Sequence, residues 1–162
     1  MYLLDANAFM EANRLYYAFD IAPGFWTWLG DPSLAGEVAS IDAVKGEITA
    51  GSGDLVDWAR ARPDSFWLPD TEDVLASMRG LAAWATDPAR RYRQEAVDEF
   101  LDSADLKLIA HAMAAGATVV TREQPAPDAK KKIKIPDACN AFGLVWTDPF
   151  SLYRTLGMRL VA

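Results

Sequence analysis

Short apolar runs alternate along the chain with stretches in which apolar residues recur at helical spacing. Apolar runs without polar alternation are typical of buried strands in a parallel sheet, and they occur at residues 2–4, 65–68, 117–121 and 144–146. Residues 37–41 fit either a brief strand or the start of a helix. Helical spacing predicts helices over residues 6–19, 42–50, 54–62, 71–84, 89–102 and 103–115, with a short helix after Asp148-Pro149.

The clearest unit in the pattern is a helix followed by a buried strand. Ser103 and Asp105 open the helix, Gly116 ends it, and the β-branched run 117–121 follows. A helix, a terminating glycine and a buried strand form the second half of a βαβ unit, which is expected to be right-handed. The sequence therefore predicts one α/β domain over residues 1–162, rich in helix, with a short parallel β-sheet flanked by helices.

Charge and composition narrow the chemistry that this domain can perform. The net charge of −7 excludes a basic surface over the whole protein, although a local basic patch remains open. Cys139 and His111 are the only residues of their types, which excludes thiolate clusters and multi-histidine metal sites, and both are expected to be structural. Because neither a signal peptide nor a membrane-spanning run is recognised, we expect a soluble, cytoplasmic protein whose chemistry depends on carboxylates.

Four acidic residues stand at positions where an α/β sheet places its ligands. Asp5 follows the first strand, Glu123 lies just beyond the strand 117–121, Asp105 lies in the first turn of the helix before that strand, and Glu47 lies in the helix 42–50. Ligands of open parallel sheets bind at the carboxyl ends of the strands. A solvated carboxylate on a helix face is the commoner fate of each acid alone, but a carboxylate at the end of a buried strand needs a compensating cation.

A divalent cation would provide that compensation. Neighbouring carboxylates near a protein surface repel each other by up to about 4 kcal/mol, and a bound ion converts this repulsion into affinity. Oxygen ligands without histidine or cysteine favour Mg²⁺ or Mn²⁺ over Zn²⁺. Such a site suits the activation of water for phosphodiester hydrolysis.

The motifs also resemble a known family. The motifs that show this resemblance are Asp5-Ala6-Asn7 after the first strand, Val44-Lys45-Gly46-Glu47-Ile48, the helix start 104–110, and Val119-Val120-Thr121-Arg122-Glu123. In this order they resemble the PIN-domain (PIN-like) ribonucleases, and residues 130–139 resemble a branch of that family. Many PIN domains are toxins of bacterial toxin–antitoxin pairs (VapC-like). The resemblance implies a three-layer α/β/α fold, an RNA substrate, and a possible antitoxin partner or homodimer, with a helical insert at residues 54–94.

The resemblance also implies individual roles. Asp5, Glu47 and Asp105 would form the acidic, metal-binding core, and Glu123 would take the place of a fourth acid that is usually an aspartate. Asp5 and Asp105 would bind Mg²⁺ or Mn²⁺ directly, and Glu47 would complete the shell or hold a water as general base. Asn7 and Thr121 would support the site.

The only dense basic cluster follows Glu123 closely. Its four lysines could bind the RNA backbone beside the acids, or they could form a solvated loop; they are Lys130, Lys131, Lys132 and Lys134. Trp26 and Trp28, like most of the six tryptophans, are expected in the core, although an exposed pair could instead contact a partner.

Two other functions compete with a ribonuclease. A haloacid-dehalogenase-like phosphatase also places an aspartate after its first strand, but it needs a second aspartate two residues later, where this chain has Asn7. A PIN-like module without catalysis could bind RNA or protein. Four retained acids argue against the latter, because an unused acidic cluster only destabilises the fold.

Overall fold

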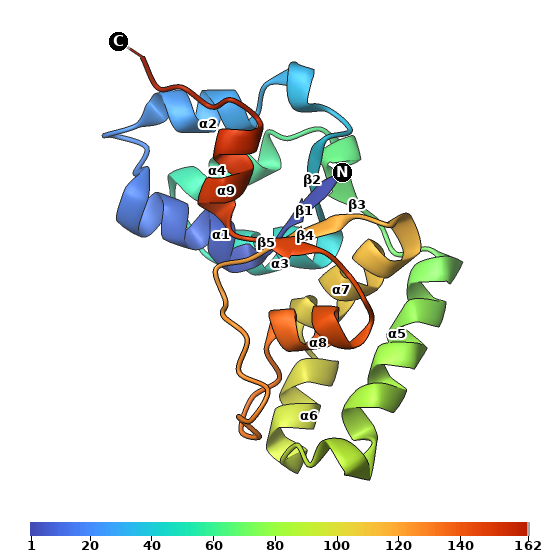
Figure 1. Cartoon of the computed structure of the whole chain (residues 1–162). Helices are drawn as coiled ribbons and strands as arrows, with labels where there is room; N and C mark the ends of the chain where they lie inside the picture. Colours follow the sequence, from blue (N-terminus) through green and yellow to red (C-terminus); the bar gives the residue numbers. More distant parts are fainter. Residues whose placement is uncertain (162) are drawn as a thin grey trace.

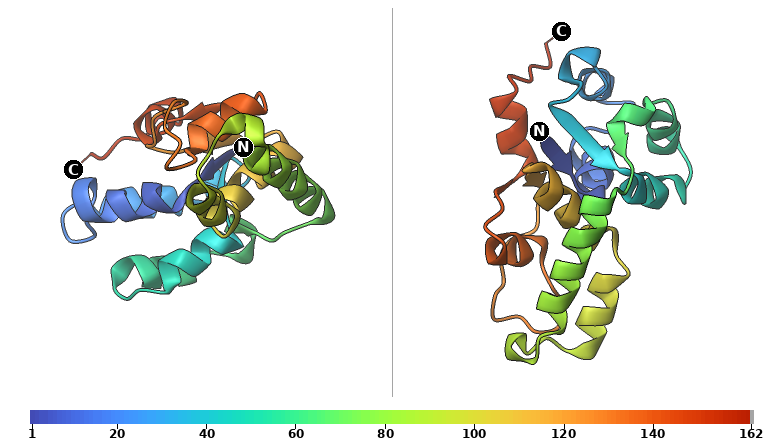
Figure 2. Two further views of the ribbon diagram at one scale, coloured as in Figure 1. Left: turned by 90° about the horizontal axis from the view of Figure 1, so that it is seen from below. Right: turned by 90° about the vertical axis from the view of Figure 1, so that its right-hand side faces the viewer.

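The computed structural model describes residues 1–161 and contains a parallel sheet of five strands within that range (Figure 1). The strands occur in the order β3-β2-β1-β4-β5, with bounds β1 Tyr2–Leu4, β2 Val38–Ile41, β3 Trp67–Leu68, β4 Thr118–Val120 and β5 Trp146–Thr147. Helices flank the sheet in a three-layer arrangement (Figure 2). The predicted helix-rich α/β class is therefore confirmed.

The helices mostly follow the predicted pattern. Their bounds are α1 Ala6–Glu11, α2 Pro23–Leu29, α3 Asp42–Thr49, α4 Asp54–Arg60, α5 Glu72–Thr86, α6 Gln94–Leu101, α7 Ala104–Ala115, α8 Ile135–Ala141 and α9 Pro149–Thr155. One π-helical segment, η1 Ala12–Tyr16, extends α1, and short 3₁₀ turns occupy η2 Pro32–Leu34, η3 Asp64–Phe66 and η4 Pro88–Arg90.

Local hydrogen bonds explain why several helices begin and end where they do. The Ser103 hydroxyl accepts a hydrogen bond from the Leu106 N–H at the start of α7, and the Thr71 hydroxyl accepts one from Val74 at the start of α5. Gly116 ends α7 in the left-handed region, with φ of +63°. These predicted boundaries are confirmed, and each depends on a residue at the end of the helix itself.

Three segments differ from the prediction. The helix expected over 6–19 is α-helical only to Glu11, becomes π-helical and ends at Tyr16. The helix expected over 89–102 is wrong at its start: Pro88 begins a 3₁₀ turn that breaks at Arg91, whose φ is +60°, before α6 begins at Gln94. Helix α8 was not predicted, although Pro136 lies in its first turn.

The segment 54–94 contributes more than helices. It contains α4 and α5, but it also provides β3, which pairs in parallel with β2 and forms one edge of the sheet. Helix α5 packs along α7, and α5 and α6 form a hairpin that projects from the sheet beside α8 and the loop before it (Figures 1 and 2).

The core lies between the sheet and the helices. Its largest fully buried side chains include Phe9, Phe25 and Trp67, and the rings of Phe9 and Trp67 lie 5.8 Å apart. Trp26 is also buried, as expected. Between Met1 and Val161, the chain has no helix with the length and apolar character needed to cross a membrane.

Candidate functional site

Asp5 is the most deeply buried acid and lies where β1 ends. Its side chain is the N-cap of α1: Oδ1 accepts a hydrogen bond from the Ala8 N–H at 2.6 Å, and Oδ2 accepts one from the Thr121 hydroxyl at 2.7 Å. Asp5 is 1% exposed. Burial raises the pKa of Asp5 to about 7, and the negative charges of Asp105 and Glu123 also raise it, against the two hydrogen bonds.

Thr121 connects the ends of β1 and β4. Its hydroxyl donates to Asp5 and accepts a hydrogen bond from the Glu123 N–H at 3.1 Å. Thr121 is fully buried, so it fixes both the orientation of the Asp5 carboxylate and the turn that presents Glu123. Asn7, the other expected supporting residue, is exposed and makes no side-chain hydrogen bond within residues 1–161.

Asp105 faces the same region from the first turn of α7. Burial raises its pKa to about 6, the charges of Glu123 and Glu47 raise it further, and Lys132 opposes them. The charge of Asp105 also raises the pKa of Asp5. Asp105 is therefore close enough to Asp5, Glu47 and Glu123 for each pair to interact electrostatically.

Glu123 occupies a mixed environment between the acids and the lysines. Its Oε2 accepts a hydrogen bond from the Ile135 N–H at 2.7 Å, and its Oε1 lies 3.7 Å from the Lys132 ammonium and 3.9 Å from that of Lys134. The Glu123 side chain is 12% exposed. Two lysines and one backbone donor therefore contact this carboxylate, whose negative charge also acts on Asp5 and Asp105.

Glu47 is the most solvated of the predicted acids. It is exposed on α3 and lines a groove of about 430 Å³ between that helix and the turn from α6 to α7. Ser103 lines this groove and also the small cavity that Asp105 and Lys132 share. The groove of Glu47 and the cavity of Asp105 therefore adjoin at the start of α7.

The four acids do not form a preformed metal cluster. Within the described part of the chain, no group of three or more histidine, cysteine, aspartate or glutamate side chains is placed to hold a metal ion. Asp5 accepts two hydrogen bonds from protein donors, and Glu123 accepts one. Asp5 is buried and Asp105 is partly buried, and neighbouring acids raise the pKa of both, which is the condition that an added cation relieves.

The four lysines divide into two environments. Lys132 and Lys134 contact Glu123, as a role beside the acids requires. Lys131 is exposed. Lys130 points elsewhere: its ammonium donates to the Pro127 carbonyl and lies 5.0 Å from the centre of the Tyr92 ring.

Arg122 is a candidate that sequence patterns alone do not single out. Its guanidinium donates to the Tyr16 hydroxyl, lies 3.3 Å from the Glu11 carboxylate, and lies over the Tyr16 and Phe150 rings. Its position between Thr121 and Glu123, at the carboxyl end of β4, is the signal that could have identified it. Arg122 thus places a cation at the same edge of the sheet as the acids.

His111 has the structural role that was expected. Its Nε2 hydrogen-bonds to Asp70 at 3.1 Å, and Lys107 donates to the same carboxylate at 2.7 Å. Burial alone would raise the pKa of Asp70, but the hydrogen bonds from Lys107 and His111 outweigh it and lower that pKa. Cys139 is likewise buried, and burial raises the pKa of its thiol to about 12.

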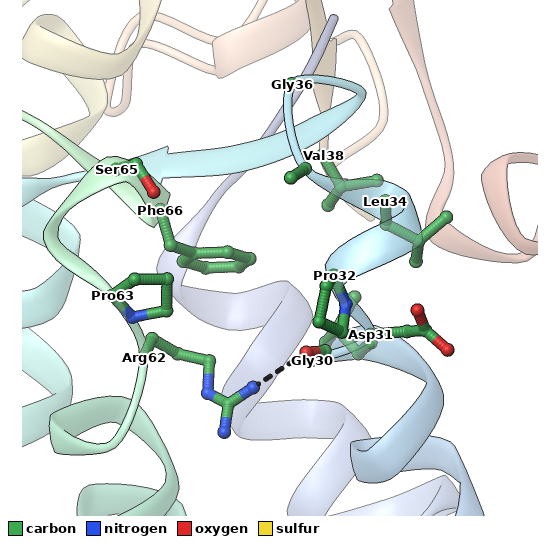
Figure 3. Close-up of a pocket in the computed structure, with 12 residues that line it drawn as sticks. Gly30, Asp31, Pro32, Leu34, Gly36, Val38, Arg62, Pro63, Ser65 and Phe66 are labelled. Carbon is green, nitrogen blue, oxygen red and sulfur yellow. Dashed lines mark hydrogen bonds between the residues drawn. The ribbon is translucent and has the colours of Figure 1, made fainter.

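A separate apolar cavity of about 320 Å³ lies before the starts of β2 and β3, at the sheet edge opposite the acids (Figure 3). Leu34, Val38 and Phe66 line it, and the Arg62 guanidinium closes one side by donating to the Gly30 carbonyl at 3.0 Å. Asp31 and Ser65 also line it.

Comparison with known proteins identifies a family. Residues 2–160 match the family model described as Domain of unknown function (DUF4411). No curated protein and no solved structure matches the chain. Because the family model covers nearly the entire sequence, the chain belongs to the DUF4411 family.

Proposed function

We propose that the protein is a metal-dependent endoribonuclease that hydrolyses RNA phosphodiesters at the acidic edge of its sheet. The observation that carries this proposal is the pairing of Asp5 and Asp105. Asp5 is 1% exposed and Asp105 is partly buried, the pKa of each is raised, and the charge of Asp105 contributes to the pKa of Asp5. Raised carboxyl pKa values at a cleft are typical of functional sites.

The donor set fits Mg²⁺ or Mn²⁺. Asp5 and Asp105 would hold the ion directly, and Glu123 and Glu47, which are bonded to other groups or solvated, would contribute through bound water. When bound, such an ion supplies Lewis-acid stabilisation of phosphoryl charge and a water of lowered pKa.

The remaining groups position and stabilise the substrate. Thr121 holds the Asp5 carboxylate in one orientation through its 2.7 Å hydrogen bond. Lys132 and Lys134 present ammonium groups beside Glu123, where they would neutralise a scissile phosphate. Glu47, on its solvated groove, would accept the proton of the attacking water.

Cleavage of RNA by purified protein tests this proposal. Single-stranded or structured RNA should be cut only with Mg²⁺ or Mn²⁺ present, and EDTA should stop the reaction. Asp5→Asn and Asp105→Asn should each abolish cleavage while circular dichroism shows a folded chain. Wild-type rates in both variants would overturn the assignment of the site.

A binding module without catalysis is the second candidate. It is favoured by the absence, within residues 1–161, of a preformed group of three potential metal ligands. This candidate expects tight RNA binding without cleavage at any concentration of Mn²⁺. A role as a cytoplasmic toxin with an antitoxin partner, or as a homodimer, is proposed by resemblance alone, and a neighbouring gene for a small DNA-binding protein would support the toxin role.

A further inference from the structure

A further cavity lies where the α5–α6 hairpin meets the loop before α8. It has a volume of about 420 Å³, within the range of small-molecule sites. Trp84 at the end of α5, Arg90 and Tyr92 after it, Lys130 from the loop and Asp137 of α8 all line it. In Figures 1 and 2, the loop lies beside the tip of the hairpin. Residues distant in sequence therefore line one cavity.

Two aromatic rings form one wall of this cavity. The Trp84 and Tyr92 rings meet edge to face, with centroids 5.7 Å apart. The Trp84 Nε1 is buried and has no hydrogen-bond partner within the described residues. The two rings therefore give this wall of the cavity an apolar, aromatic surface.

Two cations stand at the same wall. The Lys130 ammonium lies 5.0 Å from the Tyr92 ring centre, and Arg90 is exposed at the rim. Burial raises the pKa of Tyr92, the charge of Asp137 raises it further, and Arg90 opposes them, so both charged groups act on the Tyr92 hydroxyl. The Arg93 N–H donates to the Lys130 carbonyl at 2.9 Å and fixes the loop against the hairpin.

The loop connects this cavity to the acids over a short distance. Lys130 lines the cavity, and Lys132, two residues later, contacts Glu123 and lines the cavity of Asp105. Two residues of extended chain span at most about 7 Å. Aromatic faces flanked by cations are the usual surface for single-stranded nucleic acid, where bases stack and phosphates pair with lysine or arginine.

We propose that this cavity binds one nucleotide of a single-stranded RNA, with its base against Tyr92 and Trp84 and its phosphate on Arg90 and Lys130. The identity of the ligand as RNA rests on the proposed function. The cavity would hold a nucleotide beside the scissile phosphodiester and so fix which bond reaches Asp5 and Asp105.

Nucleotide binding in EDTA tests the cavity without any cleavage. Titration calorimetry would use the four ribonucleoside 5′-monophosphates and inorganic phosphate as ligands. Stacking on one aromatic ring contributes about 1–3 kcal/mol, so Tyr92→Leu should weaken nucleotide binding about fivefold or more. Tyr92→Phe keeps the ring and should bind as the wild type does. Phosphate alone should bind much more weakly than any nucleotide.

Removal of the Arg90 charge provides a second test of nucleotide binding, at an exposed position where substitution should not disturb folding. Arg90 is exposed, so Arg90→Gln should fold normally and weaken nucleotide binding severalfold. Arg79→Gln removes the same charge from exposed α5 outside the cavity and serves as the matched control. Undetectable nucleotide binding by the wild type, or equal binding by Tyr92→Leu, Arg90→Gln and wild type, would overturn the proposal.

The outcomes separate this inference from the nuclease proposal. Nucleotide binding that depends on Tyr92, in a protein that cleaves no RNA, would support the cavity and refute the nuclease. RNA cleavage that Asp105→Asn abolishes but Tyr92→Leu leaves at the wild-type KM would support the nuclease and refute the cavity.

Discussion

Replacement of Asp5 by asparagine should change the pH dependence of stability in a direction that the structure fixes. Burial raises the pKa of Asp5 from its ordinary value of 3.8 to about 7 in the folded protein. A carboxyl whose pKa is raised by folding contributes stability that is fully present below about pH 3.8 and is lost as the pH rises through about 7. An asparagine side chain cannot ionise, and Asp5→Asn should therefore remove this loss.

The magnitude follows from the same two pKa values. The difference between a pKa of 3.8 and one of about 7 means that ionisation of Asp5 lowers the unfolding free energy by about 4 kcal/mol between low pH and a pH above 7. Asparagine has one acceptor oxygen, so it can satisfy either Ala8 or Thr121 but not both, which costs about 1 kcal/mol. These two effects offset each other at about pH 4.5, where we expect equal stability, and Asp5→Asn should be up to about 3 kcal/mol more stable than wild type at about pH 8.

Urea unfolding of both proteins at these two pH values in EDTA measures the differences. Asp105 also titrates in this range and is present in both proteins, so only the part of its contribution that is coupled to Asp5 enters the comparison. If the stability difference between Asp5→Asn and wild type were the same at both pH values within about 0.5 kcal/mol, Asp5 would not titrate near neutrality. The acidic edge would then not be poised to receive a cation.

Three further predictions concern other parts of the fold. Asp70→Asn should lower the unfolding free energy by about 1 kcal/mol at pH 7, because a carboxyl whose pKa is lowered by folding stabilises the protein above its unfolded pKa. Thermal unfolding at several pH values should show this loss disappear as the pH falls through the folded pKa of Asp70. Lys132→Gln with Lys134→Gln should raise KM for RNA and flatten its salt dependence, whereas Lys131→Gln, without a carboxylate contact, should do so less. Gly116→Ala should cost about 1 kcal/mol in urea unfolding, since its φ is +63° but no atom lies within 4 Å of the added Cβ; an unchanged midpoint would contradict the strain.

The sequence predicted the parts of the fold that depend on neighbouring residues. Ser103 and Gly116 bound α7 by local hydrogen bonds and backbone conformation, which any window of the sequence displays. The break at Arg91 and the separate helix α8 depend on distant contacts instead: the Arg93 N–H bonds to Lys130, and Glu123 accepts from the first residue of α8. No local pattern reports such contacts.

The same distinction holds for the candidate site. The position of Asp5 after a buried strand follows from the chain order, and the structure places it at the carboxyl edge of the sheet. The division of the lysines does not follow, because Lys130 is attracted to Tyr92, a residue about forty positions away whose placement depends on the hairpin. Arg122 was hidden for a similar reason, since its partner Tyr16 comes from the far end of the chain.

Asp70 gives the edge strand β3 an importance beyond its two residues. Asp70 follows β3 and hydrogen-bonds to both Lys107 and His111 of α7, so it holds the edge of the sheet against the helix whose first turn contains Asp105. A shortened chain that lacks residues 54–94 would keep all four acids of the site. It would lose the Asp70 contacts that hold α7 in its orientation. A smaller version of this protein designed around the four acids is therefore expected to misplace Asp105 unless another residue replaces the contacts of Asp70 with Lys107 and His111.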